Sequence, residues 1–188
     1  ETSPSEDRTY NTQVLIDPAG DIASVYRKIH LFDVDIDEKR SYRESDSIRP
    51  GSEIVTAHAD IGGEQTVVGL TVCYDLRFPE LYRRLVGEGA EVLTVPSAFT
   101  LTTGRDHWHP LLQARAIENQ CYVLAPNQWG THFGNRASYG HSAIYDPWGR
   151  RLACAPDRVC LITAELDFDY LQDVRSRLPS LDHRTIDS

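Results

Sequence analysis

The chain has 188 residues, which is enough for one domain with a hydrophobic core. Its hydrophobic content of 40% and charged content of 25% are ordinary for a globular protein, and no apolar run approaches the roughly 20 residues that cross a bilayer. The formal net charge of −9, without a basic cluster, argues against a nucleic-acid partner, and no signal-peptide pattern is present. These features indicate a cytoplasmic enzyme with no membrane partner.

Two strands are expected after a polar start. Segment 1–9 is polar, and we expect it to be disordered. Residues 12–17 and 23–28 alternate well enough to be paired strands, and the sequence DPAGD between them is typical of a turn. From Asp33 to Pro50 the chain is highly charged, which predicts a long loop.

Apolar segments at 53–61, 66–74 and 90–99 predict three further strands. The last two are largely continuous apolar runs, which is typical of a sheet buried on both faces. A helix is expected over 78–90, and the spacing of apolar residues predicts a second one over 105–119.

The C-terminal part is expected to contain short strands followed by a helix. Strands are predicted at 121–127, 142–147, 151–156 and 159–166, and the helix at 169–177. Alternation of strands and helices with buried strands indicates an α/β fold, and the later hairpins indicate two sheets packed together. Because the sequence shows no repeat or domain boundary, 1–188 is interpreted as a single domain.

The four cysteines have no spacing typical of a metal site. Cys73, Cys121, Cys154 and Cys160 form no C-x-x-C pair, no histidine pair has the His-x-x-x-His spacing, and four reduced thiols are expected. Cys121 lies in an apolar run and is expected to be a small buried hydrophobe. Cys154 and Cys160 could face each other across a hairpin, and a structural role is expected for both.

Cys73 is the candidate nucleophile. It stands at the end of an apolar strand and directly before a predicted helical turn, in GLTVCYDLRFPELYRRL. Such an elbow projects a side chain from the sheet edge, and the N–H groups of the turn favour a thiolate. A structural cysteine is the alternative.

Lys28 and Glu44 are candidates to support this nucleophile. Lys28 ends a strand between apolar neighbours, so a half-buried ammonium there would need half-buried carboxylate partners. An ammonium beside Cys73 would lower the thiol pKa and stabilise an oxyanion. The alternatives are a lysine that points to solvent and, for Glu44 in its charged segment, a solvated carboxylate.

Seven ordered motifs together resemble the nitrilase superfamily of carbon–nitrogen hydrolases. They are YRKIHLFD, RES, GLTVCYDLRFPELYRRL, PSAFTLTTGRDHW, LLQARAIENQCYV, YGHSAIYDPWG and LDFDYL. The nearest branch contains the deaminated-glutathione amidases and ω-amidases. The resemblance implies an αββα sandwich fold, a Glu–Lys–Cys catalytic triad, no cofactor and no metal.

The resemblance also implies roles for particular residues. Cys73 matches the nucleophile, Lys28 the oxyanion-stabilising lysine and Glu44 a second glutamate that supports the lysine. The backbone N–H of Tyr74 would complete the oxyanion hole. Arg77 matches a position where some members bind a substrate carboxylate, with a structural salt bridge as the alternative.

Two further positions and one departure complete the comparison with the family pattern. Ala98 and Phe99 match residues that line the substrate pocket. The general-base glutamate of the family belongs to an early segment, whereas Glu1 and Glu6 have no matching context. We therefore expect the first strands and helices of the sandwich, and the base, to be absent from this chain and supplied by a complementing N-terminal segment.

The predicted activity is hydrolysis of a short carboxylate-bearing amide through a thioester, with release of ammonia. Deaminated glutathione and an ω-amide of a 2-oxo acid are the expected substrates, and N-carbamoyl compounds or nitriles are alternatives. A non-catalytic fragment or pseudo-enzyme that acts as a binding partner is a second interpretation, and a metal-dependent hydrolase a third. The family pattern further implies a homodimer or larger homo-oligomer.

Overall fold

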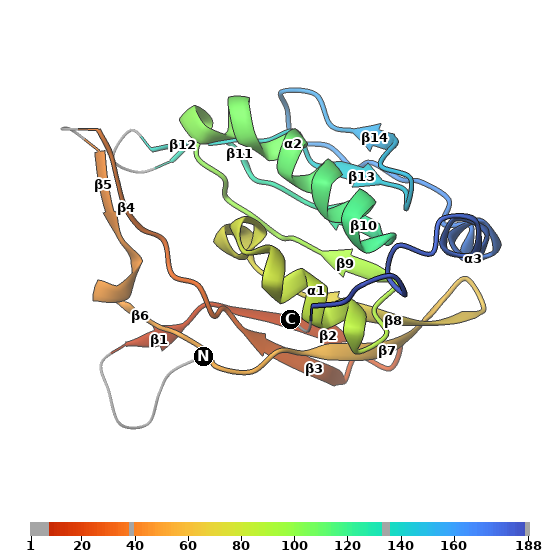
Figure 1. The fold of residues 1–188 in the computed structure, drawn as a ribbon. Helices are drawn as coiled ribbons and strands as arrows, with labels where there is room; N and C mark the ends of the chain where they lie inside the picture. The colour runs from red at the N-terminus through yellow and green to blue at the C-terminus, as the bar shows by residue number, and fades with distance from the viewer. Residues whose placement is uncertain (1–7, 38–39, 133–135, 187–188) are drawn as a thin grey trace.

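A six-stranded mixed sheet carries most of the buried core (Figure 1). The computed structural model describes residues 8–37, 40–132 and 136–186. In spatial order the sheet consists of β14 (Arg151–Cys154), β13 (Ala143–Tyr145), β10 (Tyr122–Ala125), β9 (Val92–Thr94), β8 (Glu64–Leu70) and β7 (Thr56–Ile61). The three middle strands β10, β9 and β8 are parallel, and antiparallel strands flank them.

Both faces of the three middle strands are buried, as the continuous apolar runs predicted for β8 and β9. Neighbouring residues on a strand point to opposite faces, so Leu93 and Val123 lie in one core cluster whereas Val92 and Tyr122 lie in the other. Three helices accompany the sheet: α1 (Pro79–Gly87), α2 (Leu101–Asn119) and α3 (Phe168–Arg177). Helices α1 and α2 pack on the first cluster, and Leu171 of α3 packs in the second.

Short two-stranded ribbons make up the rest of the strand structure. They are β1 (Thr9–Tyr10) with β6 (Ile48–Arg49), β2 (Thr12–Ile16) with β3 (Ile22–Arg27), β4 (Asp33–Asp37) with β5 (Arg40–Arg43), and β11 (Trp129–Thr131) with β12 (Ala137–Tyr139). The β2–β3 hairpin confirms the first predicted pair of strands. Figure 1 shows the β4–β5 ribbon standing away from the main sheet.

The prediction of a loop from Asp33 to Pro50 is wrong. This segment forms β4, β5, the 3₁₀ turn Glu44–Asp46 and β6. Its charges lie on an exposed ribbon and pair across it: Arg43 donates to both carboxylate oxygens of Asp35 at 2.9 and 2.8 Å. Charge density therefore marked solvent exposure rather than an absence of strands.

Further expectations concern the ends of the chain, and the structure contradicts some of them and confirms another. The predicted strand at 159–166 does not form, and side chains there such as Val159 are exposed, so Cys154 and Cys160 do not face each other across a hairpin. Of the polar start at 1–9, residues 1–7 lie outside the described residues, and Thr9 already belongs to β1. The predicted C-terminal helix is confirmed as α3.

The longest helix of the described residues is α2, with 19 residues. Neither it nor any other helix in this part of the chain combines the length and the apolar character needed to cross a membrane.

Candidate active site

Cys73 lies at a strained elbow between β8 and a 3₁₀ turn. Val72 is still extended, Cys73 has a φ of 51°, and the turn spans Cys73–Arg77. A non-glycine residue with positive φ stores about 1 to 3 kcal/mol of strain and is over-represented at functional sites. The Cys73 N–H donates to Pro96 O at 3.0 Å, which ties the elbow to the end of the neighbouring strand. The predicted elbow is confirmed.

A fully buried carboxylate holds the elbow in place. Oδ2 of Asp75 accepts hydrogen bonds from Val72 N at 2.8 Å and from Tyr26 Oη at 2.7 Å. Oδ1 accepts from His30 N at 3.2 Å and lies 2.8 Å from His30 Nδ1. Because Tyr26 and His30 flank Lys28 in sequence, Asp75 joins the Cys73 turn to the Lys28 segment.

The sequence reasoning missed this network. An acidic residue two positions after Cys73, between apolar neighbours in VCYDL, was the available signal. Burial and the charge of Asp75 raise the pKa of the Tyr26 hydroxyl far above its ordinary value, so it stays protonated and donates to that carboxylate.

Lys28 and Glu44 form a buried ion pair beside the elbow. Lys28 is 2% exposed and the Glu44 side chain 16%, and Lys28 Nζ lies 2.5 Å from Glu44 Oε2. The same oxygen accepts from Phe32 N at 2.7 Å, and Oε1 accepts from Asn11 Nδ2 at 3.1 Å. Neither side chain points to solvent, so both solvent-exposed alternatives are wrong.

Backbone contacts fix the position of Lys28. Its N–H donates to Asn11 O and its carbonyl accepts from Gly51 N, both at 2.8 Å. A Cβ at Gly51 would lie 2.2 Å from Arg27 O, so only glycine permits this approach. The segment 50–51 therefore supports the lysine directly.

Opposing effects act on the Cys73 thiol, and burial is the largest of them. Burial raises its pKa, the Lys28 ammonium and the Ala98 N–H lower it, Glu44 raises it and the Ser97 hydroxyl lowers it. The net effect is a raised pKa, so the neutral thiol predominates near pH 7. This differs from the expected thiolate, because desolvation outweighs the ammonium and the N–H groups of the turn.

All seven candidate site residues line one cleft of about 920 Å³. They are Lys28, Glu44, Cys73, Tyr74, Arg77, Ala98 and Phe99. Tyr74 belongs to the first turn of the 3₁₀ segment and precedes the first hydrogen bond of that turn, from Asp75 N to Val72 O at 3.1 Å. A backbone N–H at such a position has no partner within the turn. The cleft also contains residues that the sequence reasoning missed, among them Asn127, Gln128, His132 and Arg136.

Arg77 is a cation of the cleft with aromatic neighbours. Its guanidinium carbon lies 5.2 Å from the ring centre of Phe99 and 5.9 Å from that of Tyr74, and Nη1 lies 3.3 Å from His107 Nδ1. Within the part of the chain that the structure describes, no carboxylate pairs with it. The alternative of a structural salt bridge is therefore not seen there.

One group of metal-ligating side chains, His109, His141 and Cys154, is found among the described residues. None of the three lines this cleft.

Comparisons with known proteins agree with this arrangement. Residues 1–176 match the carbon-nitrogen hydrolase family. A deaminated glutathione amidase from Synechocystis sp. is 49% identical over 178 residues, which cover 94% of this chain and 64% of the relative. The chain thus spans less than two thirds of the length of this relative.

Solved structures show the same fold. The crystal structure of the C. elegans NitFhit protein superposes with a TM-score of 0.89 at 43% identity, over 97% of this chain and 44% of that one. An amidase from Nesterenkonia sp. AN1 with acrylamide added to its active-site cysteine has a TM-score of 0.69 at 31% identity, over 89% and 61% of the two chains. The predicted nitrilase-type α/β fold is confirmed, and the chain belongs to the carbon-nitrogen hydrolase family of the nitrilase superfamily.

Proposed function

We propose that Cys73 is the nucleophile of an amidase that hydrolyses a short, carboxylate-bearing amide and releases ammonia. The observation that carries this proposal is the strained Cys73 elbow, which lines the same cleft as the buried Lys28–Glu44 pair. The similarity to deaminated glutathione amidases and to an amidase with a reactive active-site cysteine supports it.

The proposed reaction proceeds through a thioester. Cys73 Sγ attacks the amide carbon while a base takes the thiol proton, and the carbonyl electron pair becomes an oxyanion facing the Lys28 ammonium and the Tyr74 N–H. The carbon–nitrogen bond then breaks, the base returns the proton to nitrogen, and ammonia leaves. Water hydrolyses the thioester to a carboxylic acid and restores the thiol.

A base is essential to this proposal because the raised pKa keeps the Cys73 thiol protonated. Glu44 does not fill this role, because its two oxygens are occupied by Lys28, Phe32 N and Asn11. We assign the proton transfer to a further carboxylate, the early glutamate that the family resemblance implies. Such general-base catalysis contributes about 10² to 10⁴ in rate.

The charge of the cleft supports a substrate with a carboxylate. Arg77 and Arg136 line it, and the guanidinium carbon of Arg136 lies 5.1 Å from the Tyr42 ring centre. Arginine presents a planar fork that binds a carboxylate through two hydrogen bonds. We propose that Arg77 is the principal contact, because its aromatic neighbours fix its position within the cleft.

Ammonia release by the full-length protein tests this proposal. A panel should include deaminated glutathione, ω-amides of 2-oxo acids, neutral amides of equal length, N-carbamoyl compounds and nitriles. We expect carboxylate-bearing amides to react fastest, Cys73→Ala to abolish turnover, and mass spectrometry of quenched samples to detect an acyl adduct on wild type alone. Normal hydrolysis by Cys73→Ala would refute the assignment.

Other outcomes of the same panel would select the alternatives. Preference for a nitrile or an N-carbamoyl compound would change the substrate class and leave Cys73 as nucleophile. Binding of the amides without ammonia release or adduct would favour a non-catalytic binding partner. Arg77→Met should raise KM for the acidic amides more than for neutral ones of equal length.

We also propose a cytoplasmic homo-oligomer. Support comes from the described cysteines, all of which are free thiols, and from one apolar face of the β2–β3 hairpin. Val14 and Ile16 of β2 oppose Val25 and Ile22 of β3, and these side chains are 37 to 64% exposed. Contiguous apolar exposure of this kind marks an association surface. Light scattering on the full-length protein tests the oligomeric state.

A further inference from the structure

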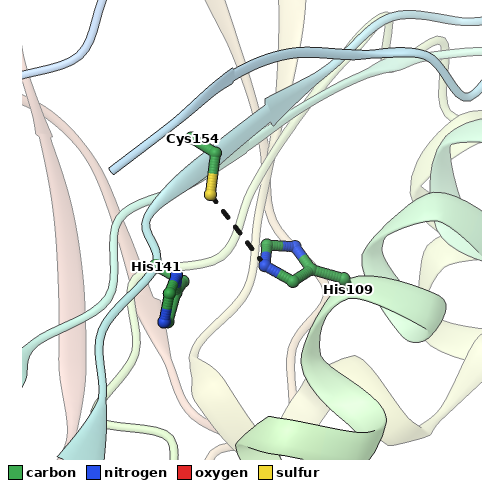
Figure 2. Close-up of side chains that lie close together, drawn as sticks. All are labelled: His109, His141 and Cys154. Atoms are coloured by element: carbon green, nitrogen blue, oxygen red, sulfur yellow. Dashed lines mark hydrogen bonds between the residues drawn. The ribbon is translucent and has the colours of Figure 1, made fainter. Parts of the chain in front are cut away.

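Three side chains that the proposed mechanism does not use converge at one place (Figure 2). They are His109 from α2, His141 from the segment between β12 and β13, and Cys154 from the end of β14. One ligand atom from each lies within 4.8 Å of the others, and Cys154 Sγ is 4.0 Å from His109 Nε2. Figure 2 shows the thiol directed at that nitrogen.

These separations are close to those of a tetrahedral zinc site. With Zn–N near 2.05 Å and Zn–S near 2.3 Å, ligand atoms lie about 3.3 to 3.6 Å apart. The observed distances exceed this range by little more than 1 Å at most. Small rotations of the side chains therefore suffice to bring the three atoms onto one ion.

Each imidazole has the second partner that metal-binding histidines usually have. His109 Nδ1 lies 2.9 Å from Tyr145 Oη, which leaves Nε2 directed at Cys154. His141 Nε2 lies 2.9 Å from Asp157 Oδ1. Such contacts orient the ring and raise its basicity as a ligand. The contacts of His109 with Tyr145 and of His141 with Asp157 are independent of the proximity of the three candidate ligands.

The fold also orients His141 and provides access. His141 has a φ of 54°, and its carbonyl accepts a hydrogen bond from Trp108 Nε1 at 2.8 Å, so its backbone is fixed to the helix that carries His109. It lines a second cleft of about 300 Å³, which reaches Cys160 on the exposed segment beyond β14. An ion has a route from solvent to the cluster.

The donor set favours a borderline-soft divalent cation. Two imidazoles and a thiolate suit Zn²⁺, whereas Mg²⁺ and Ca²⁺ require oxygen ligands. Burial raises the pKa of the Cys154 thiol, so a metal must displace its proton.

We propose that His109, His141 and Cys154 form a zinc-binding site, with water as the fourth ligand. Binding releases the Cys154 proton to the buffer and joins α2 to the β13–β14 edge of the sheet. The site lies outside the Cys73 cleft, so we assign it a role in fixing α2 to the sheet edge, and the proposal does not depend on the amidase function.

Metal titration of the full-length protein tests the proposal. The protein is stripped with a chelator and carries Cys73→Ala, so that the nucleophile cannot bind the ion. We expect one Zn²⁺ per chain by calorimetry, with proton release that scales with buffer ionisation. Co²⁺ should produce visible bands typical of tetrahedral geometry and a near-ultraviolet thiolate charge-transfer band.

Substitutions identify the ligands. Cys154→Ser should abolish the charge-transfer band, and His109→Ala should weaken Zn²⁺ binding by more than the 10- to 100-fold that is typical of a supporting residue. Tyr145→Phe should weaken it by about 10-fold. His107→Ala is the matched control, because this exposed histidine lies on the same helix outside the cluster.

The outcomes are decisive in both directions. The proposal is wrong if Zn²⁺ binds no more tightly than about 10 µM, if His107→Ala weakens binding as much as His109→Ala, or if Cys160→Ser rather than Cys154→Ser removes the charge-transfer band. Circular dichroism establishes folding of each variant, and if Cys154→Ser fails to fold, His109→Ala decides. A rise in Tm on Zn²⁺ addition, absent in His109→Ala, would support the structural role.

Discussion

Different kinds of interaction position the two halves of the candidate active site. Cys73 lies just beyond the end of β8 in the six-stranded sheet and packs against two apolar clusters whose members are almost fully buried. Lys28 and Glu44 stand on short ribbons and turns, where hydrogen bonds and close backbone contacts supply most of the support. Cys73 is therefore positioned largely by packing, and the Lys28 ammonium largely by polar contacts.

Apolar packing of Tyr26 against Leu70 and Val72 and a set of hydrogen bonds connect the halves, and Asp75 supplies several of these bonds. It binds Tyr26 and His30 from the ribbon side and Val72 from the sheet side. Gln13 of β2 adds a hydrogen bond of 2.8 Å to Thr94 of β9. Substitutions in the sheet should therefore mainly lower the free energy of unfolding, whereas substitutions in the ribbons should mainly lower catalytic activity.

The largest effect is expected for Lys28→Met. Loss of one preformed oxyanion-stabilising group lowers kcat by about 10² to 10³-fold. Stability should fall as well, because Glu44 keeps its bonds to Phe32 N and Asn11 but loses the partner of its charge. Steady-state kinetics and thermal unfolding measure the two effects. Arg27→Met, one residue away and outside the cleft, is the control; equal losses in both variants would show that the effect is not specific to Lys28.

The next largest effect is expected for Asp75→Asn. An amide in place of this carboxylate leaves at least one buried donor, such as the Val72 N–H, without an acceptor, at a cost of about 1 to 3 kcal/mol. Tyr26→Phe removes one hydrogen bond to the same group and should cost about 1 kcal/mol. Urea unfolding measures both, and a larger loss for Tyr26→Phe would contradict the central position of Asp75.

Alanine substitution of two glycines, one beside the Lys28 segment and one in the sheet, tests the same distinction. At Gly51 a Cβ would lie 2.2 Å from Arg27 O, and at Gly69 a Cβ would lie 2.9 Å from Leu93 Cδ2 in the core. Each alanine substitution should cost about 1 to 3 kcal/mol through overpacking. Gly51→Ala should in addition lower kcat/KM, because it displaces the Lys28 segment. Equal losses of kcat/KM in both variants would contradict the distinction between the sheet and the ribbons.

The smallest effect concerns pH. Burial raises the pKa of Cys73 above its ordinary value of 9.0, so the folded state keeps the thiol proton to higher pH than the unfolded state. Its contribution to stability is therefore lost as pH rises above the unfolded pKa. The rate of Cys73 alkylation should rise with pH through a midpoint above 9.0, and Lys28→Met should shift that midpoint upward. A midpoint below 9.0 would show that the ammonium outweighs burial.

Much of the fold was predictable because local signals agreed with tertiary burial. The apolar runs of β8 and β9 and the helical spacing of α2 specify buried elements regardless of their neighbours. The ribbon β4–β5 was missed because the density of charge in this segment favoured a loop, although Val34 and Ile36 alternate with aspartates in β4. The segment 159–166 was misassigned because its β-branched residues fit a strand, yet no neighbouring strand pairs with it in the structure.

The sequence by itself determined the family and identified Cys73, Lys28 and Glu44 as candidate site residues, because long ordered motifs carry them. The tertiary structure alone decided how they are held. Asp75 acquires its role only when the elbow meets the Lys28 segment, since its donors are distant in sequence. The same holds for His109, His141 and Cys154, which no local spacing connects and which only the packing of α2 against the sheet edge brings together.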